Sequence, residues 1–271
     1  MELIKARNVG FSYASQRVLH GIDFTLYAGD VVSLLGPNGS GKSTLLKILL
    51  GLYRSSGEVT LLGKKLQHYK QAELAQHIAY VPQSHNMPFT FTAFDVVLMG
   101  RLAYCGMFSN YSKVDRNLAH DALEKVAMSA LADEPFSNLS GGQQQLVLIA
   151  RALAQQAHIL LMDEPVNGLD YGNQIRLLRL IKDFSSQGYT FLKTTHHPDH
   201  ALYCSNRVAL LKRGRMLACD GVERVLTAEN IATLYGVEVE IMCTEQGERF
   251  CLPCGSASID FKAVPAAMSA A

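Results

Sequence analysis

The chain has 271 residues, a length that corresponds to one large domain or two small ones and is sufficient to bury an independent core. Its 25 Lys and Arg residues against 24 Asp and Glu give a formal net charge of +1, so no basic track for nucleic acid is expected. With 48% hydrophobic and 18% charged residues, the composition is that of a folded globular protein and excludes a disordered chain.

No segment of the sequence is expected to span a membrane. A spanning helix needs about 20 nearly uncharged apolar residues, and the most apolar stretch, residues 146–162, contains Arg151, Gln155, Gln156 and His158. The N-terminus, MELIKARNVG, has neither the apolar core nor the small-residue cleavage site of a signal peptide. We therefore expect a protein that is neither membrane-spanning nor exported.

Six cysteines are scattered along the chain, a usage typical of free thiols in a reducing cytoplasm. Cys251 and Cys254 have the CxxC spacing of redox and metal sites. However, no second cysteine pair or histidine pair completes a zinc set, and no thioredoxin-like βαβ pattern surrounds them. Free thiols are therefore expected, with a metal or redox role as the alternative.

The first 35 residues are predicted to form strands. Residues 3–4 and 9–11 are short β-type runs, and residues 21–26 alternate with the period of two of a half-buried strand. After a turn at residues 28–30, residues 31–35 form a continuous apolar run, which is typical of a strand buried on both faces.

Helical and strand segments alternate through most of the remaining chain. The expected elements are a helix over about 42–52, strands over 58–62, 158–162, 189–195 and 207–211, and a short helix with two strands within 227–252. Residues from about 84 to 134 have helical spacing and predict an all-helical insertion. Strands that alternate with helices predict an α/β fold with a mostly parallel sheet. Residues 263–271, rich in Ala and Ser, are expected to be frayed.

The sharpest local pattern follows the strand at 31–35. It fits GxxxxGK(S/T) between a strand and a helix, which is the context of a phosphate-binding loop. With the residue that follows, the pattern comprises Gly36, Pro37, Asn38, Gly39, Ser40, Gly41, Lys42, Ser43 and Thr44. Glycines let successive N–H groups converge on phosphate oxygens, and the helix N-terminus adds its positive dipole end. Lys42 would reach the β- and γ-phosphates, and the Ser43 hydroxyl would bind Mg²⁺.

A second ligand for that metal is expected at the end of another strand. Residues 159–162 are hydrophobic and are followed directly by Asp163 and Glu164. Asp163 would hold Mg²⁺, directly or through water, and Glu164 would orient and polarise the attacking water. A strand that ends in two acids is common, so this assignment depends on the phosphate-binding loop.

A second anion-binding helix start lies in the same chain. The sequence LSGGQ places a serine as N-cap and two glycines where a phosphate can approach the backbone. Its residues are Leu139, Ser140, Gly141, Gly142 and Gln143. A chain with a complete phosphate-binding loop has no need of this start for its own nucleotide. It makes sense if it closes over the nucleotide of another subunit.

Together these three motifs resemble the nucleotide-binding subunit of ATP-binding cassette (ABC) transporters, over nearly the whole chain. The resemblance implies a P-loop NTPase core with a mostly parallel sheet, an N-terminal antiparallel β region and an inserted helical subdomain. It also implies ATP and Mg²⁺ as ligands and a head-to-tail homodimer with two ATP molecules at its interface. It implies that Tyr13 stacks on adenine and that Gln83 is a metal ligand that senses the transmembrane partner. It also makes His196 the switch histidine on the γ-phosphate and places Asp170 in the loop that communicates across the dimer.

The residues that the resemblance assigns outside the three motifs could also have purely structural roles. Tyr13 could be an ordinary strand aromatic and Gln83 a surface turn residue. His196 and His200, four residues apart with His197 between them, superficially suggest a metal site. The γ-phosphate role of His196 disfavours that metal site.

The apolar residues that follow Gln83 leave two interpretations open. They are Met87, Phe89, Phe91 and Phe94. They form either the core of the helical insertion or part of the groove that receives a transmembrane subunit, because a core and a groove use the same residue types.

Two departures from the family pattern are present. Residues 166–168 are Val-Asn-Gly where the family commonly has Thr-Ser-Ala, although Asp170 is kept. His197 and Pro198 follow the switch histidine, where many relatives have Asp and an aliphatic residue. We expect coupling across the dimer to survive and the flexibility of the loop to differ.

Within the family, the chain resembles importers for iron–siderophore complexes, haem and vitamin B12. The resemblance lies in Met99-Gly100-Arg101, in residues 169–174 and in residues 226–237. It implies polytopic permease subunits as partners, an indirect link to a substrate-binding protein, and a place on the cytoplasmic face of the inner membrane. Residues 1–240 would form one ATPase domain with a helical subdomain at about 84–135, and 241–271 a strand extension with a flexible tail.

Other functions are kept as alternatives. A molybdate or tungstate importer is a close relative, and a soluble ABC ATPase of the iron–sulfur assembly type would have no membrane partner. A DNA-repair or chromosome ATPase is disfavoured because no heptads of a long coiled coil separate the motifs. A translation factor of this family would carry two cassettes, and this chain carries one.

Overall fold

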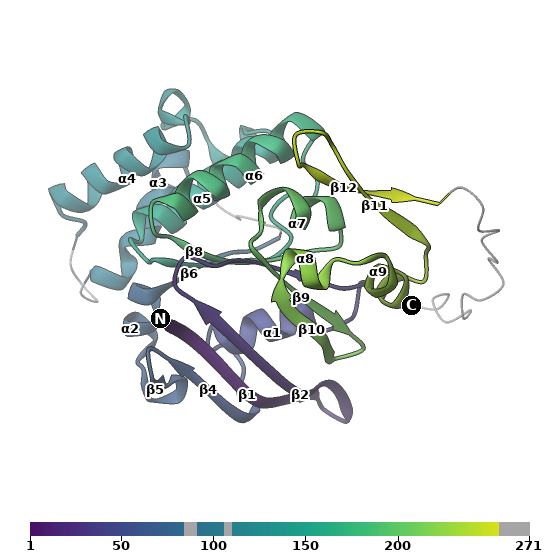
Figure 1. The fold of residues 1–271 in the computed structure, drawn as a ribbon. Coiled ribbons are helices and arrows are strands. Elements are labelled where there is room, and N and C mark those ends of the chain that lie inside the picture. The colour runs from purple at the N-terminus through teal and green to yellow at the C-terminus, as the bar shows by residue number, and fades with distance from the viewer. Residues whose placement is uncertain (84–90, 106–109, 255–271) are drawn as a thin grey trace, which may run out of the picture.

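The computed structural model describes residues 1–83, 91–105 and 110–254. A central β-sheet lies between helices, a second sheet from the N-terminal part lies at the bottom of the view, and a two-stranded hairpin lies at one side near the C-terminus (Figure 1). Among the residues described, no helix combines the length and the apolar character needed to cross a membrane.

The N-terminal sheet is antiparallel, as the sequence predicts, with strand order β2-β1-β4-β5. Its strands are β1 (Glu2–Tyr13), β2 (Gln16–Tyr27), β4 (Ser56–Leu61) and β5 (Lys64–Lys65). The two separate short strands predicted at 3–4 and 9–11 are wrong, since both belong to β1. The register of β1 against β2 shifts between Ala6 and Val9, and Asn8 there has a φ of 49°. This irregularity interrupts the alternation along one continuous strand.

The central sheet has strand order β10-β9-β3-β8-β7-β6. Its strands are β3 (Val31–Leu35), β6 (Ile78–Val81), β7 (Ile159–Met162), β8 (Thr190–Thr195), β9 (Arg207–Lys212) and β10 (Arg215–Gly221). All neighbours pair in parallel except β9 and β10, so the prediction of a mostly parallel sheet is confirmed. Every residue of β3 is buried, as its continuous apolar run predicts.

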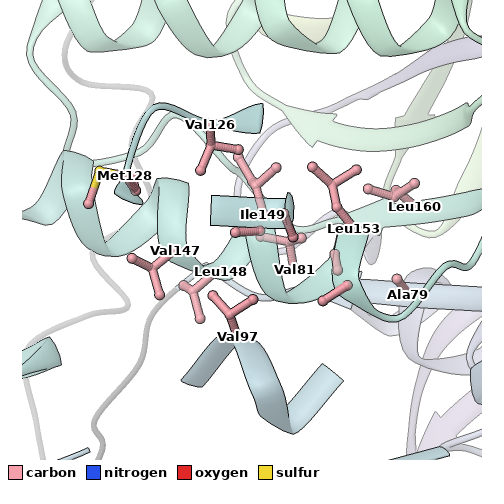
Figure 2. Packing of buried hydrophobic residues seen from close by; sticks show 14 of the residues in the cluster. Ala79, Val81, Val97, Val126, Met128, Val147, Leu148, Ile149, Leu153 and Leu160 are labelled. Carbon is pink, nitrogen blue, oxygen red and sulfur yellow. The ribbon is translucent and has the colours of Figure 1, made fainter. Parts of the chain in front are cut away.

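Helices cover both faces of the central sheet (Figure 1). The helix α1 (Lys42–Leu49) shares one buried cluster with strands of both sheets. The helices α3 (Ala93–Leu98), α4 (Lys113–Lys125), α5 (Gly141–Ala154) and α6 (Tyr171–Ser186) contribute to a second cluster. In Figure 2, Ile149 and Leu153 of α5 lie over Val81 and Leu160 of the sheet. This packing attaches the helical region, formed by α3, α4, α5 and α6, to the strands β6 and β7 of the central sheet.

Part of the predicted helical insertion lies outside the described residues. The described part contains α3, α4 and the 3₁₀ turns Met99–Tyr104 and Ser129–Leu131. The helical spacing predicted up to about residue 134 is interrupted, because α4 ends at Lys125. Ala127 has a φ of 57°, which a right-handed helix cannot accommodate.

The C-terminal part packs as a third buried cluster against the end of the sheet. Its elements are α7 (Pro198–Cys204), α8 (Val222–Val225), α9 (Ala228–Tyr235), β11 (Val239–Cys243) and β12 (Arg249–Pro253). The predicted short helix and two strands are thereby confirmed. The backbone N–H of Cys251 donates to Asp199 Oδ1 at 2.7 Å and ties the hairpin to α7. All six cysteines are free thiols.

Arg101 forms a buried ion pair within the helical region. Its Nε donates to Asp115 Oδ1 at 2.8 Å, and its NH1 donates to the carbonyl oxygen of Ala154 at 2.9 Å. Hydrogen bonds from Ser112 and Arg101 lower the pKa of Asp115 from 3.8 to about 2. Arg101 thus connects α4 to the last turn of α5, which gives the Met99-Gly100-Arg101 stretch a structural role.

Arg101→Ala is expected to lower the free energy of unfolding by about 3 kcal/mol, because the buried Asp115 carboxylate loses its cationic partner and keeps only the hydrogen bonds from Ser112. Urea denaturation at neutral pH measures this loss. Arg116→Ala, at an exposed position of α4, is the control and should stay within about 0.5 kcal/mol of wild type. Equal stabilities of the two variants would contradict this role.

The same ion pair predicts how stability depends on pH. The folded-state pKa of Asp115 lies below its ordinary value, so its contribution is present above about pH 4. That contribution is lost as the pH falls toward 2. The stability difference between wild type and Arg101→Ala should therefore shrink over this range, which denaturation at a series of pH values measures.

Candidate functional site

The phosphate-binding loop (residues 36–44) joins the end of β3 to the start of α1. Gly39 and Gly41 have φ values of 75° and 104°, where any other residue would strain the backbone. A Cβ at Gly36 would collide with the carbonyl oxygen of Leu211 and lie 2.6 Å from Ser40 Oγ. The backbone of the loop therefore demands glycine at all three positions.

Lys42, the first residue of α1, is buried inside this loop, with 5% of its surface exposed. Its Nζ donates to the carbonyl oxygens of Gly36 at 2.7 Å and Pro37 at 3.2 Å. Glu164 Oε1 lies 3.6 Å from the same ammonium group. Burial lowers the pKa of Lys42, and the negative charges of Glu164 and Asp163 oppose that shift. The loop thus holds a positive charge next to the acids that follow β7.

Glu164 also contacts the histidine that follows β8. Its Oε2 lies 3.2 Å from His196 Nδ1. Because β3, β8 and β7 are parallel neighbours, their carboxyl ends lie at one edge of the sheet. This edge brings together Lys42, Glu164 and His196, which the sequence predicts as site residues. Asp163, 5% exposed, stands beside them at the end of β7.

Thr194 is a residue of this site that the motifs did not reveal. It is fully buried near the end of β8, and its Oγ1 donates to Asp163 Oδ1 at 2.7 Å. The N–H of Glu164 donates to the same Oγ1, also at 2.7 Å. The sequence carried no distinctive signal for it, because β8 (TFLKTT) contains three threonines and a lysine.

Tyr13 lies in an aromatic group at the end of β1, next to α1. Its ring meets those of Phe11 and Tyr53 edge to face, with centroids 4.8 and 5.7 Å away. Its hydroxyl lies 3.5 Å from Thr44 Oγ1, a contact that lowers the pKa of Tyr13. Tyr13 remains 43% exposed, so part of its ring is free to stack on a planar ligand beside the phosphate-binding loop.

The LSGGQ segment (residues 139–143) starts α5. Ser140 is its N-cap, accepting from the N–H of Gln143 at 3.3 Å, while Gln143 Oε1 accepts from the N–H of Ser140 at 2.8 Å. A Cβ at Gly142 would lie 2.8 Å from Asn173 Nδ2. Asp170 is the N-cap of α6 and accepts from Asn173. The segment therefore packs beside the Asp170 loop.

The structure describes some of the predicted residues that follow β6 and not others. Gln83 is exposed at the end of a described stretch. Met87 and Phe89 lie outside the described residues. Phe91 and Phe94 pack against the buried cluster of the helical region, as the core interpretation predicts for these two residues.

The rings of the three histidines after β8 contact one another in tilted pairs. The ring of His197 lies 4.0 Å from that of His196 and 4.7 Å from that of His200, centroid to centroid. Burial lowers the pKa of His197 and lowers that of His200 to about 4. In the part of the chain that the structure covers, no three His, Cys, Asp or Glu residues are arranged to hold a metal ion.

The residues of the loop fit a nucleotide phosphate with its cation. Ser40 Oγ is buried without a hydrogen-bond partner, and the ammonium of Lys42 is held by carbonyl oxygens that a phosphate can replace. The Ser43 hydroxyl and one carboxylate oxygen of Asp163 are the hard oxygen ligands that Mg²⁺ prefers. The arrangement can bind a phosphoryl group, with a carboxylate close by to act on a water molecule.

Comparisons with known proteins show the family of the chain. Residues 19–167 match the family model described as ABC transporter. The hemin import ATP-binding protein HmuV of Thermobifida fusca is 37% identical over 89% of this chain and 84% of its own length. The molybdate import ATP-binding protein MolC of Haemophilus influenzae is 37% identical over 86% of this chain and 87% of its own.

A solved structure shows the same fold. It is a metal-chelate type ABC transporter in an inward-facing conformation, with a TM-score of 0.83 and 32% identity over 94% of this chain and 99% of the other. The family match covers more than half of the chain and includes both the phosphate-binding loop and the acids after β7. The chain therefore belongs to the ABC transporter family, as an ATP-binding subunit with the P-loop ATPase fold of that family.

Proposed function

We propose that the chain is the ATP-hydrolysing subunit of a membrane importer, bound at the cytoplasmic face of the membrane to polytopic permease subunits. The cargo class is a metal chelate of the iron–siderophore, haem or cobalamin type. The observation that carries the enzymatic assignment is the convergence of Lys42, Glu164 and His196 beside the phosphate-binding loop.

Each site residue has a chemical task in this proposal. Bound ATP with Mg²⁺ supplies a phosphoryl group whose developing charge the cation neutralises. The backbone N–H groups of the phosphate-binding loop, which Pro37 lacks, and the ammonium group of Lys42 would bind the phosphates, while Tyr13 would stack on the base. Ser43, Asp163 and Gln83 would hold the cation.

Glu164 is the general base of the proposed reaction. Its carboxylate accepts the proton of the attacking water, in the position fixed by Lys42 on one oxygen and His196 on the other. His196, besides orienting this carboxylate, faces the γ-phosphate. The carboxylate is only 11% exposed, so few bulk water molecules compete for it.

The second half of each site is assigned to another copy of the chain, packed head to tail. Nearest to a Cβ at Gly141 is the carbonyl oxygen of Gly168, and nearest to one at Gly142 is Asn173. The side chains of Ser140 and Gln143 bond to each other's backbone N–H groups. In this proposal the N-terminus of α5 binds the nucleotide that is held by the phosphate-binding loop of the partner, and the Asp170 loop lies beside it.

The cargo assignment draws on relatives and on local sequence. Hemin import and metal-chelate transport appear in the names of relatives. The Met99-Gly100-Arg101 stretch resembles an element of chelate importers. Molybdate or tungstate import is the alternative, supported by a relative of equal identity. Residues 1–240 form the ATPase domain in this proposal, with the helical subdomain at about 84–135 and residues 241–271 as an extension.

Two measurements test the proposal. Affinity purification of the full chain from detergent-solubilised membranes of its own host is expected to recover a polytopic permease. Recovery of the chain without any membrane protein would favour the soluble ATPase alternative. Uptake assays with the cognate binding protein should show transport of a ferric chelate, haem or cobalamin, whereas transport of molybdate alone would overturn the cargo class.

A further inference from the structure

Thr194 pairs with Leu34 of β3, but it lies one residue beyond the ladder that joins β8 to β7. The ladder between β7 and β8 ends with the pair Met162 and Lys193. Asp163 and Glu164 follow beyond the last pair, so the sheet itself does not hold them opposite β8. Thr194, one residue beyond the ladder on the other strand, contacts both acids with a single hydroxyl group.

The direction of the two hydrogen bonds follows from the groups involved. An ionised carboxylate only accepts, and a backbone N–H only donates. Thr194 therefore gives its one proton to Asp163 Oδ1 and accepts from the N–H of Glu164, both at 2.7 Å. This use of Oδ1 leaves Oδ2 of Asp163 for a cation.

The hydrogen bond to Glu164 also secures an unusual backbone. Glu164 has a φ of 44°, in the left-handed region that non-glycine residues rarely adopt. Such a conformation persists where the surroundings over-determine it. Here the hydroxyl of Thr194 fixes the N–H, while Lys42 and His196 contact the side chain.

We propose that Thr194 is a positioning residue for the ATPase reaction: it orients the carboxylate of Asp163 toward the cation and holds the turn that presents Glu164 to the attacking water. The inference rests on the roles proposed above for these two acids. Thr194 does not touch substrate; it acts through residues that do.

A second threonine of β8 provides a matched control. Thr190 is 1% exposed, and its Oγ1 accepts a hydrogen bond from the N–H of Gly29 at 3.0 Å. It has the same residue type, strand and burial as Thr194, but it lies at the opposite end of β8 from the acids. Thr190→Val therefore measures what the loss of a buried hydroxyl does to the fold alone.

The first readout needs neither nucleotide nor metal. Hydrogen exchange of peptides that contain Glu164 should be at least about 10-fold faster in Thr194→Val than in wild type, because the amide loses its acceptor. Thr194→Ser keeps the hydroxyl and should restore slow exchange, and Thr190→Val should leave these peptides unchanged. Unchanged exchange in Thr194→Val would overturn the proposal.

The second readout is ATP hydrolysis by the purified full chain over a range of Mg²⁺ concentrations. Thr194→Val should raise the Mg²⁺ concentration for half-maximal rate and lower kcat, each by about 10-fold or more, with ATP affinity in EDTA within about twofold of wild type. Thr194→Ser should recover most of both losses. A Thr194→Val variant with wild-type Mg²⁺ dependence, or a Thr190→Val variant with the same defect, would overturn the proposal.

These measurements use no permease and no cargo. Failure to recover a permease would overturn the proposed importer function and leave the Thr194 result standing. Conversely, a wild-type response of Thr194→Val would remove the positioning role and leave the importer assignment untouched.

Discussion

Glu164→Gln is expected to lower the rate of ATP hydrolysis by about 10²- to 10⁴-fold while ATP still binds, because the amide has the shape of the carboxylate but cannot accept a proton from water. Glu164 lies between the two other site residues, since its Oε1 contacts Lys42 and its Oε2 contacts His196. We therefore expect the substitution to affect the reaction itself. Phosphate release measures the rate, and equilibrium binding of labelled ATP measures the affinity.

The control for this prediction is Glu223→Gln, at an exposed position of α8. It makes the same chemical change away from the phosphate-binding loop and should hydrolyse ATP at the wild-type rate. Wild-type turnover by Glu164→Gln would show that another group acts as the base.

Lys42→Ala is expected to weaken ATP binding by about 10- to 100-fold, since a hydrogen bond to a charged group contributes about 1.5–3 kcal/mol. The ammonium group is already directed into the loop by the carbonyl oxygens of Gly36 and Pro37, so binding requires little rearrangement of the side chain. Titration calorimetry with ATP in the presence of Mg²⁺ measures the affinity.

Lys64→Ala removes the same charge from an exposed lysine paired with Glu73 and should bind ATP as wild type does. If Lys42→Ala retained wild-type affinity, the phosphates would have to bind elsewhere. A cooperative unfolding transition of Lys42→Ala, measured in parallel, separates a binding defect from misfolding.

Motifs that are local in sequence were predictable, and features that depend on tertiary contacts were not. The phosphate-binding loop could be recognised because three glycines and a lysine within eight residues, between a buried strand and a helix, form a pattern specific to phosphate binding. The strand β6 was not predicted from the sequence. Its four residues directly follow the helix α2 (Gln71–His77), and they show clearly neither the 3.6-residue period of a helix nor the two-residue period of a strand. The edge strand β10 is only half-buried, which weakens its pattern.

Thr194 shows the limit of sequence reasoning most clearly. Its hydrogen bonds reach residues 30 and 31 positions away in the chain, and they exist because β7 and β8 are neighbours in the sheet. The irregularity at Asn8, which interrupts the alternation along β1 and made one strand look like two, likewise depends on pairing with β2. Such features require the assembled sheet before they can be recognised.

The head-to-tail arrangement can be tested through the LSGGQ segment because Gly141 has room for a side chain within its own chain. The only neighbour of a Cβ there within 4 Å, among the residues that the structure describes, is the carbonyl oxygen of Gly168, at 3.9 Å. Gly141→Asp should therefore fold normally and bind ATP at its own phosphate-binding loop. Its carboxylate would repel the phosphates of a nucleotide held by a partner chain.

The most direct measurement is the mass of Glu164→Gln in solution with ATP, by size-exclusion chromatography with light scattering. We expect the mass of two 29.7 kDa chains with ATP and of one chain without it. Adding Gly141→Asp to Glu164→Gln should keep the protein at one chain although ATP still binds. A Glu164→Gln protein that binds ATP and stays a single chain, or a double variant that still pairs, would contradict a site completed by a second copy.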